Sequence, residues 1–232
     1  MIIDNSLPWT YDMDQATRLQ ENLSRRVLTT WDGRKVATVA GVDTYDDGEN
    51  IHAAIAVFNF PNLTHITTVT CNSPQAFPYI SGLLAFRIGP AILAAWDKLT
   101  LTPDLIIMHG QGIAHPRGFG LASHVGVWLN IPTIGVAKTR LYGKPAEAGP
   151  LVGEWSEIRD EHRQKKIIGA SVRTQADVKP VYVSPGHLID LPHSIEYVLA
   201  CCRGFRMPEP IRAAAQAASD SVPKDRNLLI AA

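Results

Sequence analysis

DLIIMHGQGIAHPRGFGLASHVGVWLNIPTIGVAK, residues 104–138, is the stretch that decides the fold class. It contains two short apolar runs, at 104–109 and 132–138, that are typical of strands buried on both faces. Between them, HVGVWLN at 124–130 is predicted to be helical. A strand, a helix and a second strand in this order indicate parallel pairing through a crossover, and therefore an α/β fold.

Three strand-like segments precede this unit. They are rich in β-branched residues, are separated by turn-like sequences, and occupy residues 36–45, 51–60 and 64–72. Together they predict a three-strand meander. Apolar residues at helical spacing predict an amphipathic helix over 14–29 and another over 82–99, which Pro90 should kink or restart.

The C-terminal third continues the alternation of strands with helices. Residues 146–165 are more polar and predict a loop or hairpin that leads into two strand segments within 167–185. Two helices, roughly 194–203 and 211–219, follow. No internal repeat and no long linker interrupts the chain, so residues 1–232 are predicted to form a single domain with a mixed central sheet flanked by helices.

Composition excludes several classes of protein. The 232 residues carry 22 Lys+Arg against 22 Asp+Glu, which argues against a general nucleic-acid coat, although a local basic groove fits inside a neutral total. No apolar stretch approaches the ~18 residues that cross a bilayer, and the opening MIIDNSLPWTYDMDQ lacks the features of a secretory signal. Cys71, Cys201 and Cys202 cannot build a disulfide framework, because they are odd in number and two are adjacent. We expect a cytoplasmic protein without a membrane partner.

The densest cluster of chemically useful side chains lies inside the deciding stretch. HGQGIAHPRGFGLASH, residues 109–124, directly follows a predicted buried strand. Its glycines alternate with polar side chains: His109, Gln111, His115, Arg117 and His124. Ligands bind at the carboxyl ends of strands in open α/β sheets, and glycines let the backbone approach them closely. This segment is the predicted site; the alternative is a glycine-rich connector with satisfied surface histidines.

Asp43 and the triplet Pro78, Tyr79 and Ile80 carry weaker signals. Asp43 ends a buried strand, where a carboxylate can hold a divalent cation or simply form the turn. The triplet lies between a polar turn and a helix. It can act as a wedge that unstacks bases, or as an ordinary hydrophobic staple.

Lys138 and His187 each follow a buried strand. Lys138 can neutralise a phosphate or simply mark the strand end. His187 is expected to open a helix, with Asp190 within one turn of it, and helix capping is the alternative role of both residues. None of these features is specific when taken alone.

Taken in order, five motifs resemble the endonuclease V family: AGVDTY (40–45), PYISGLLAFR (78–87), GIAHPRGFGLASHVGVWLNIPTIGVAKTRLYGK (112–144), VSPGHLID (183–190) and FRMPEPIR (205–212). The resemblance spans most of the chain. It implies a ribonuclease H-like fold and a magnesium-dependent hydrolase that recognises deaminated bases, chiefly inosine, in DNA or RNA. It also implies cleavage one nucleotide to the 3′ side of the lesion.

The resemblance assigns roles to individual residues. The first metal-binding aspartate of the family corresponds to Asp43, and the lysine and histidine that assist at the scissile phosphate correspond to Lys138 and His187. The base-separating wedge corresponds to residues 78–80, with Ser81 where a proline is usual. The implied nucleic-acid surface further includes groups along the base pocket and in the AHPR motif: Gly82, Leu84, Gly110, Gly112, His115 and Arg117.

The catalytic centre departs from the family pattern. The glutamate expected after the FR pair is here Ile88, the aspartate that opens the DGHG motif is His109, and the next histidine is Gln111. Two of the three carboxylates expected around Mg²⁺ are therefore absent, and with them two formal negative charges. We expect magnesium-dependent cleavage to be very weak or absent, unless a neighbouring carboxylate substitutes: Asp46, Asp47 or Asp190.

Two other functions stay open. The first is a protein that keeps the wedge and the inosine pocket, binds inosine in DNA or RNA as a monomer, and does not cut. The second is altered chemistry on a nucleotide-like metabolite. In that case Asp43 and His109, joined by His187 or Gln111, form a mixed nitrogen and oxygen site that suits Mn²⁺, Zn²⁺ or another transition metal better than Mg²⁺.

Overall fold

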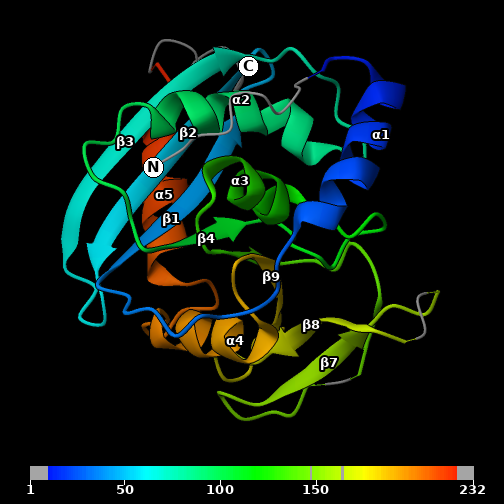
Figure 1. The fold of residues 1–232 in the computed structure, drawn as a ribbon. Coiled ribbons are helices and arrows are strands. Elements are labelled where there is room, and N and C mark those ends of the chain that lie inside the picture. The colour runs from blue at the N-terminus through cyan, green and yellow to red at the C-terminus, as the bar shows by residue number, and fades with distance from the viewer. Residues whose placement is uncertain (1–9, 147, 163–164, 224–232) are drawn as a thin grey trace.

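A computed structural model describes residues 10–146, 148–162 and 165–223. Within them, nine strands form one mixed sheet, and helices cover both of its faces (Figure 1). The strand order across the sheet is β3-β2-β1-β4-β5-β9-β8-β7-β6. The predicted fold class, α/β with a mixed central sheet flanked by helices, is confirmed.

The predicted meander forms one side of the sheet. It consists of β1 (Thr38–Asp46), β2 (Asn50–Asn59) and β3 (His65–Pro74), which pair antiparallel in sequence order. β2 is buried on both faces over 51–58, because α5 packs on one face and α2 on the other, which explains its apolar run at 53–58. These are the long curved strands at the left of Figure 1.

Two crossovers build the centre of the sheet. α2 (Leu84–Trp96) carries the chain from β3 to β4 (Leu105–His109), which lies beside β1 and parallel to it. α3 (Leu121–Leu129) then leads to β5 (Thr133–Ala137), parallel to β4. The parallel pairing expected from the deciding stretch is therefore confirmed. α2 is continuous through Pro90, so the helix is not restarted there.

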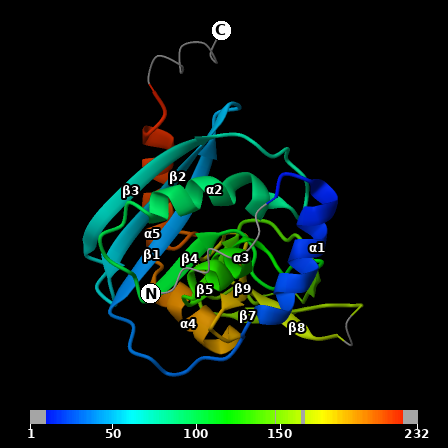
Figure 2. The ribbon, with the colours of Figure 1, turned by 45° about the horizontal axis from the view of Figure 1, so that its top comes forward.

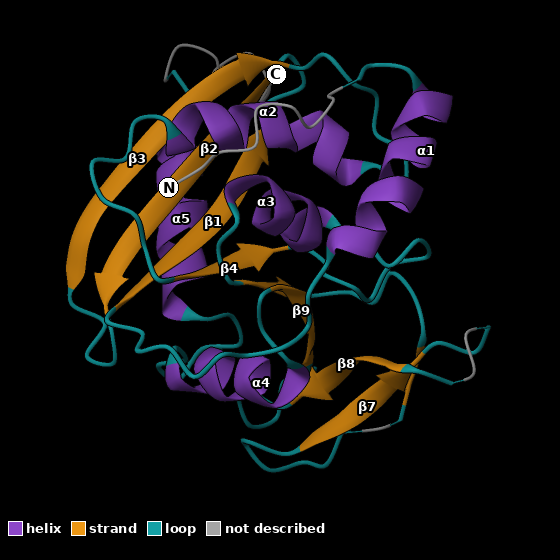
Figure 3. Ribbon diagram, in the orientation of Figure 1, coloured by secondary structure: helices purple, strands orange, loops and turns teal. Residues whose placement is uncertain are grey.

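The remaining strands extend the sheet on its other side, at the lower right of Figure 3. They are β6 (Lys144–Pro145), β7 (Trp155–Arg159), β8 (Ile167–Val172) and β9 (Val181–His187). β9 joins the sheet antiparallel to β5, and β8, β7 and β6 follow antiparallel in turn. The polar segment thus contains a hairpin, as expected.

Three helices complete the described fold. α1 (Met13–Leu23) begins at Asp12, whose side chain accepts a hydrogen bond from the Gln15 amide, and it ends in a 3₁₀ turn rather than continuing to residue 29. α4 (Leu191–Ala200) and α5 (Glu209–Asp220) are the two predicted C-terminal helices. None of the helices in the described part of the chain has the length and apolarity that a bilayer crossing requires.

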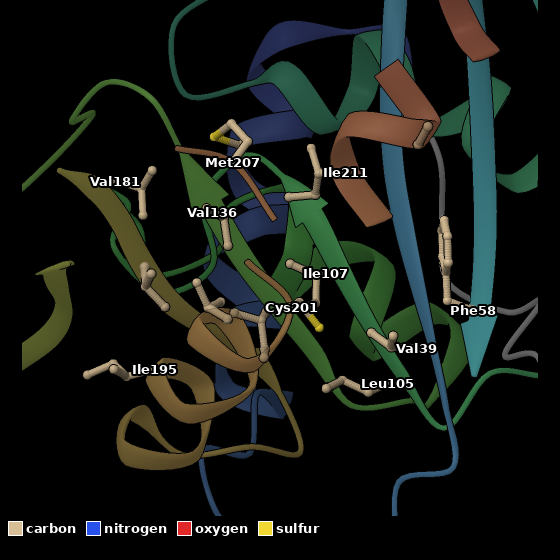
Figure 4. Close-up of a cluster of buried hydrophobic side chains, with 14 of the residues drawn as sticks. Val39, Phe58, Leu105, Ile107, Val136, Val181, Ile195, Cys201, Met207 and Ile211 are labelled. Carbon is tan, nitrogen blue, oxygen red and sulfur yellow. The ribbon is translucent and has the colours of Figure 1, made fainter. Parts of the chain in front are cut away.

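Two apolar cores lie on opposite faces of the sheet, because successive residues of a strand point to opposite sides. In β4, Leu105 and Ile107 face the layer of α4 and α5, where they belong to the same core as Ile195 and Ile211 (Figure 4). Their neighbours 106 and 108 face the layer of α2 and α3. Each such buried side chain stabilises the fold by about 1.5–3 kcal/mol.

Candidate functional site

A pocket of about 500 Å³ opens at the carboxyl ends of the parallel strands β1, β4 and β5. This is the edge at which open α/β sheets bind their ligands. The pocket brings together most of the residues singled out from the sequence: Asp43, Tyr79, Ile80, Gly82, Leu84, His109, Gly110, His115 and Lys138. It also includes Thr44 and Arg140, which lie within the motifs but were not singled out, and Gln20, which lies outside them.

Asp43 and His109 form the polar centre of the pocket. Val42 of β1 lies opposite Met108 of β4, so the next residue along each strand places these two side chains next to each other. The Nδ1 atom of His109 lies 3.0 Å from Oδ1 and 3.0 Å from Oδ2 of Asp43. Oδ1 of Asp43 also accepts a hydrogen bond from the Thr44 amide, at 2.8 Å. The carboxylate is therefore already bound by protein groups.

Ile88 lies on α2 at the edge of the same pocket. Its side chain is only 6% exposed and belongs to the apolar core between the sheet and α2 and α3. An isoleucine offers no atom that can bind a metal ion. The position where the resemblance implies a glutamate is therefore a packing position of the apolar core.

Gln111 takes a structural role beside the pocket. Its Nε2 atom donates a hydrogen bond to the carbonyl oxygen of Thr139, at 3.0 Å. From the other side, Nη2 of Arg206 donates to the carbonyl oxygen of Lys138, at 2.7 Å. These two bonds fix the backbone that follows β5, and the exposed Lys138 side chain stands at the rim of the pocket.

The three carboxylates considered as substitute metal ligands are used elsewhere. Asp46 pairs with Arg87, with Oδ2 2.5 Å from Nη2, and Asp47 pairs with His52 at 2.9 Å. Asp190 caps α4 by accepting from the His193 amide, at 2.9 Å. Among the described residues, no group of three or more His, Cys, Asp and Glu side chains can hold a metal ion. The residues at this site do not fit the carboxylate set that Mg²⁺ requires.

The predicted wedge stands clear of the protein surface. We call residues Pro78–Ser81 the wedge loop. Tyr79 is 73% exposed, while the residues on either side of the loop, Phe77 and Gly82, are buried. An exposed aromatic side chain on a short loop at the mouth of a pocket has the position that insertion between bases requires.

His115 and Arg117 point at the protein backbone. Nε2 of His115 lies 2.8 Å from the carbonyl oxygen of Gly82, and Nη2 of Arg117 donates to the same oxygen at 2.9 Å. Nε2 of Gln20 donates to it as well, at 2.9 Å. The predicted nucleic-acid contacts of the AHPR motif are thus engaged with the residue that follows the wedge loop.

Gly112 does not line the pocket. Its amide donates to Oγ of Ser184 at 2.8 Å, and a Cβ atom placed on it would lie 2.0 Å from the carbonyl oxygen of Pro185. The glycine is required there because the loop after β4 packs directly against β9. Gly110, by contrast, does lie along the pocket.

His187 corrects two expectations. It is the last residue of β9 rather than the start of a helix, and it lies opposite Thr133, at the amino end of β5. Lys138 lies just beyond the carboxyl end of β5, five residues from Thr133, which is roughly 16 Å along the strand at ~3.3 Å per residue. The structure therefore does not bring His187 to the phosphate side of the pocket, next to Lys138.

The environment of His187 is that of a structural residue. Its side chain is almost fully buried, and Nδ1 accepts a hydrogen bond from the Leu28 amide at 3.3 Å. Burial, helped by the charge of Arg26, lowers the pKa of His187 to about 4. The imidazole is neutral at physiological pH and ties the segment after α1 to β9.

The arrangement of strands identifies the class of fold. The structure of endonuclease V from Streptomyces avermitilis superposes with a TM-score of 0.86 at 37% sequence identity, covering 97% of this chain and 98% of that one. This is a ribonuclease H-like fold, as the sequence motifs implied.

The family follows from the sequence comparison. The chain matches the Endonuclease V family over residues 20–216. The endonuclease V of Trichormus variabilis is 47% identical over 216 residues, which cover 92% of this chain and 96% of that protein. The chain belongs to the endonuclease V family.

One relative has been solved with a nucleic acid. Endonuclease V of Ciona intestinalis, 25% identical with a TM-score of 0.77, was crystallised in complex with a 24mer DNA containing an inosine followed by a ribo-adenosine. The match covers 90% of this chain and 97% of that chain.

Proposed function

We propose that this protein recognises inosine in DNA or RNA strands at the pocket beside the wedge loop, and that it lacks the magnesium-dependent cleavage of its family. The observation that carries the proposal is the pairing of Asp43 with His109, beside Ile88, where the family has a carboxylate cluster. A site with one carboxylate that is already hydrogen-bonded cannot supply the negative charge that Mg²⁺ needs.

The binding half of the proposal rests on the parts of the site that are intact. The pocket volume of about 500 Å³ is in the range of sites that enclose small organic groups, which includes a purine base. The exposed Tyr79 stands at its mouth, and Lys138 and Arg140 supply positive charge at its rim, where a phosphate backbone can pass. The Ciona relative binds an inosine-containing strand.

The loss of cleavage follows from the chemistry of the reaction. Phosphodiester hydrolysis in a metal-dependent nuclease uses the ion to activate water and to stabilise the leaving oxygen. Loss of the ion costs several kcal/mol of transition-state stabilisation, at about 1.4 kcal/mol for each factor of ten in rate. Nothing among the described carboxylates compensates, because Asp46, Asp47 and Asp190 have other partners.

The transition-metal alternative is less well supported. Asp43 and His109 do converge, but His187 lies at the opposite end of β5, and Nε2 of Gln111 donates to Thr139, which leaves only its neutral Oε1 atom to offer to an ion. Two protein ligands make a weak site for a transition metal. Binding without cleavage is therefore the function that this geometry supports best.

Two measurements on one set of labelled strands test the proposal. Fluorescence anisotropy should give at least about tenfold tighter binding to inosine-containing DNA or RNA than to matched adenosine strands. The same strands with Mg²⁺ or Mn²⁺ should stay intact with the native protein, while the double change Ile88→Glu and His109→Asp should gain cleavage. Equal affinity for both strands would contradict the binding half. Cleavage by the native protein that Asp43→Asn abolishes would contradict the other half.

A further inference from the structure

The backbone oxygen of Gly82 is an unusually crowded acceptor. Three side chains from distant parts of the chain converge on it: Gln20 at 2.9 Å, His115 at 2.8 Å and Arg117 at 2.9 Å. A carbonyl oxygen has two lone pairs, so three donors on one oxygen saturate it. We call this arrangement the Gly82 clamp.

The hydrogen bonds of His115 fix its tautomer. The Gly82 oxygen only accepts, so Nε2 of His115 carries the proton and donates. Its Nδ1 atom then accepts from the Arg117 amide, at 3.2 Å. A neutral imidazole with one donor and one acceptor satisfies both bonds, which makes His115 a fixed part of the Gly82 clamp.

Gln20 connects the parts of the Gly82 clamp. It lies on α1 and is 1% exposed. Its Nε2 atom donates to Gly82 and also to the carbonyl oxygen of Phe119, at 3.1 Å, while its Oε1 atom accepts from Nε of Arg117, at 2.6 Å. Both N–H groups of the amide and its oxygen are thus engaged with the protein, although Gln20 borders the pocket.

The other end of the wedge loop is also fixed. The Phe77 ring is 1% exposed and packs against Phe86, with ring centroids 5.8 Å apart. Its carbonyl oxygen accepts from Nη1 of Arg87, at 2.8 Å, and Arg87 is in turn held by Asp46. Only the wedge loop between these two anchors projects from the surface.

A wedge separates stacked bases only if deforming the wedge costs more free energy than unstacking the bases. Ordering a loop when it binds costs free energy that a loop already fixed in its bound shape does not lose. Unstacking a base step costs a few kcal/mol, so a mobile wedge loop would fold back before it separated the bases. The stiffness of the wedge loop therefore depends on its anchors at Phe77 and Gly82.

We propose that Gln20 is a positioning residue for inosine recognition, which acts through the Gly82 clamp to hold the wedge loop in its inserting conformation. This inference rests on the proposed function, since it assigns the wedge loop a part in that binding. It gives α1, which contributes no group to the pair of Asp43 and His109, an indirect role in recognition. Figure 2 shows α1 beside α3, and Gln20 is the residue of α1 that lines the pocket.

The first test uses the free protein and needs no nucleic acid. The change Gln20→Met keeps the length of the side chain and removes both its donor and its acceptor. Hydrogen exchange at Leu83, whose amide donates to the Ile80 oxygen at 2.9 Å across the wedge loop, should become at least about tenfold faster. The matched control is Gln15→Met on the exposed face of the same helix, which should leave the exchange unchanged. Unchanged exchange in folded Gln20→Met would overturn the inference.

The second test is a double-mutant cycle on inosine binding. Gln20→Met should weaken binding of the inosine strand about tenfold in the native background, and less than twofold in a Tyr79→Ala background, where there is no wedge side chain to position. Equal losses in both backgrounds would show a merely structural role and would overturn the inference. If Gln20→Met does not fold, Gln20→Glu replaces it, since a carboxylate still pairs with Arg117 but cannot donate to Gly82.

The two tests separate failure of this inference from failure of the proposed function. If the native protein binds inosine and adenosine strands equally, the proposed function is wrong, and the exchange at Leu83 alone decides whether Gln20 holds the wedge loop. If the native protein prefers inosine and the cycle shows no coupling, the positioning role is wrong and the proposed function stands.

Discussion

Nδ1 of His109 lies equidistant, at 3.0 Å, from the two carboxylate oxygens of Asp43. The contact joins the carboxyl ends of two neighbouring parallel strands, at the position where the resemblance to the family implies carboxylates around a metal ion. His109 donates a hydrogen bond to the carboxylate of Asp43, whereas a second carboxylate at this position would repel it. The carboxylate of Asp43 thus has a protein donor as its partner, and this changes what the site can bind.

Replacing His109 with aspartate should reverse this property. In His109→Asp two carboxylates face each other without a counterion, and their repulsion should lower the free energy of unfolding by a few kcal/mol in the absence of metal. Mn²⁺ should then raise the melting temperature of the variant and leave that of the native protein unchanged, as thermal melts with and without the ion would show.

The neutral change His109→Asn serves as the control for His109→Asp, because it removes the imidazole without adding charge. It should show no metal-dependent shift. A shift of similar size in the native protein would mean that Asp43 and His109 already form a metal site, which would contradict the proposal that the native pair binds no metal ion.

Local patterns in the sequence predicted the elements of the fold but not all of their ends. The N-terminal helix was predicted to reach residue 29 but ends at Leu23. The segment after it is held in a non-helical path, because the Leu28 amide donates to Nδ1 of His187 on β9. The strand was predicted to end at Pro185, but β9 continues for two more residues, to His187. Both differences arise from tertiary contacts that no local pattern contains.

The sequence motifs predicted many of the residues of the site, but not the contacts between them. The contact between Asp43 and His109 depends on the register of β1 against β4, which the sequence does not give. Gln20 lies 62 residues from Gly82 in the chain, so no short motif includes both. One signal was available, since Gln20 is a polar residue on the buried face that α1 forms with Ala16 and Leu23.

Adding a methyl group at Gly82 should loosen the Gly82 clamp. The residue has φ +82°, which side chains other than glycine rarely adopt, and a Cβ atom would lie 3.0 Å from Nη2 of Arg117. We expect Gly82→Ala to lower the free energy of unfolding by about 1–3 kcal/mol and to weaken inosine binding. Urea unfolding and anisotropy on the same preparation measure both quantities.

Gly33→Ala is the matched control for the change at Gly82. Gly33 has φ +76°, but nothing lies within 4 Å of its added Cβ, so only the backbone strain is shared. This variant should lose some stability and keep its affinity for the inosine strand. Equal loss of affinity in both variants would mean that crowding at Arg117 plays no part.

Asp190 should contribute to stability and not to binding. Asp190→Ala removes the hydrogen bond to the His193 amide at the start of α4, and loss of such a cap costs about 0.5–2 kcal/mol. The affinity for the inosine strand should not change, because Asp190 does not line the pocket. Glu196→Ala, at an exposed position of the same helix, should change neither quantity. A loss of binding in Asp190→Ala would restore this residue as a candidate of the site.

The buried histidine at the end of β9 should make the fold sensitive to acid. The pKa of His187 is about 4 in the folded protein, because of burial and the nearby Arg26, against an ordinary value of 6.5. Between these two pH values the unfolded chain binds a proton that the folded chain does not, so the free energy of unfolding should fall as the pH drops from about 6.5 to about 4. One such proton gives a slope of at most about 1.4 kcal/mol per pH unit, and His124, whose pKa burial lowers to about 3, adds to it.

In His187→Asn, an amide oxygen can still accept from Leu28 but cannot be protonated, so urea unfolding between pH 7 and pH 5 should show a smaller slope for the variant than for the native protein. Equal slopes would mean that His187 binds a proton equally in the folded and unfolded states, and that burial does not lower its pKa.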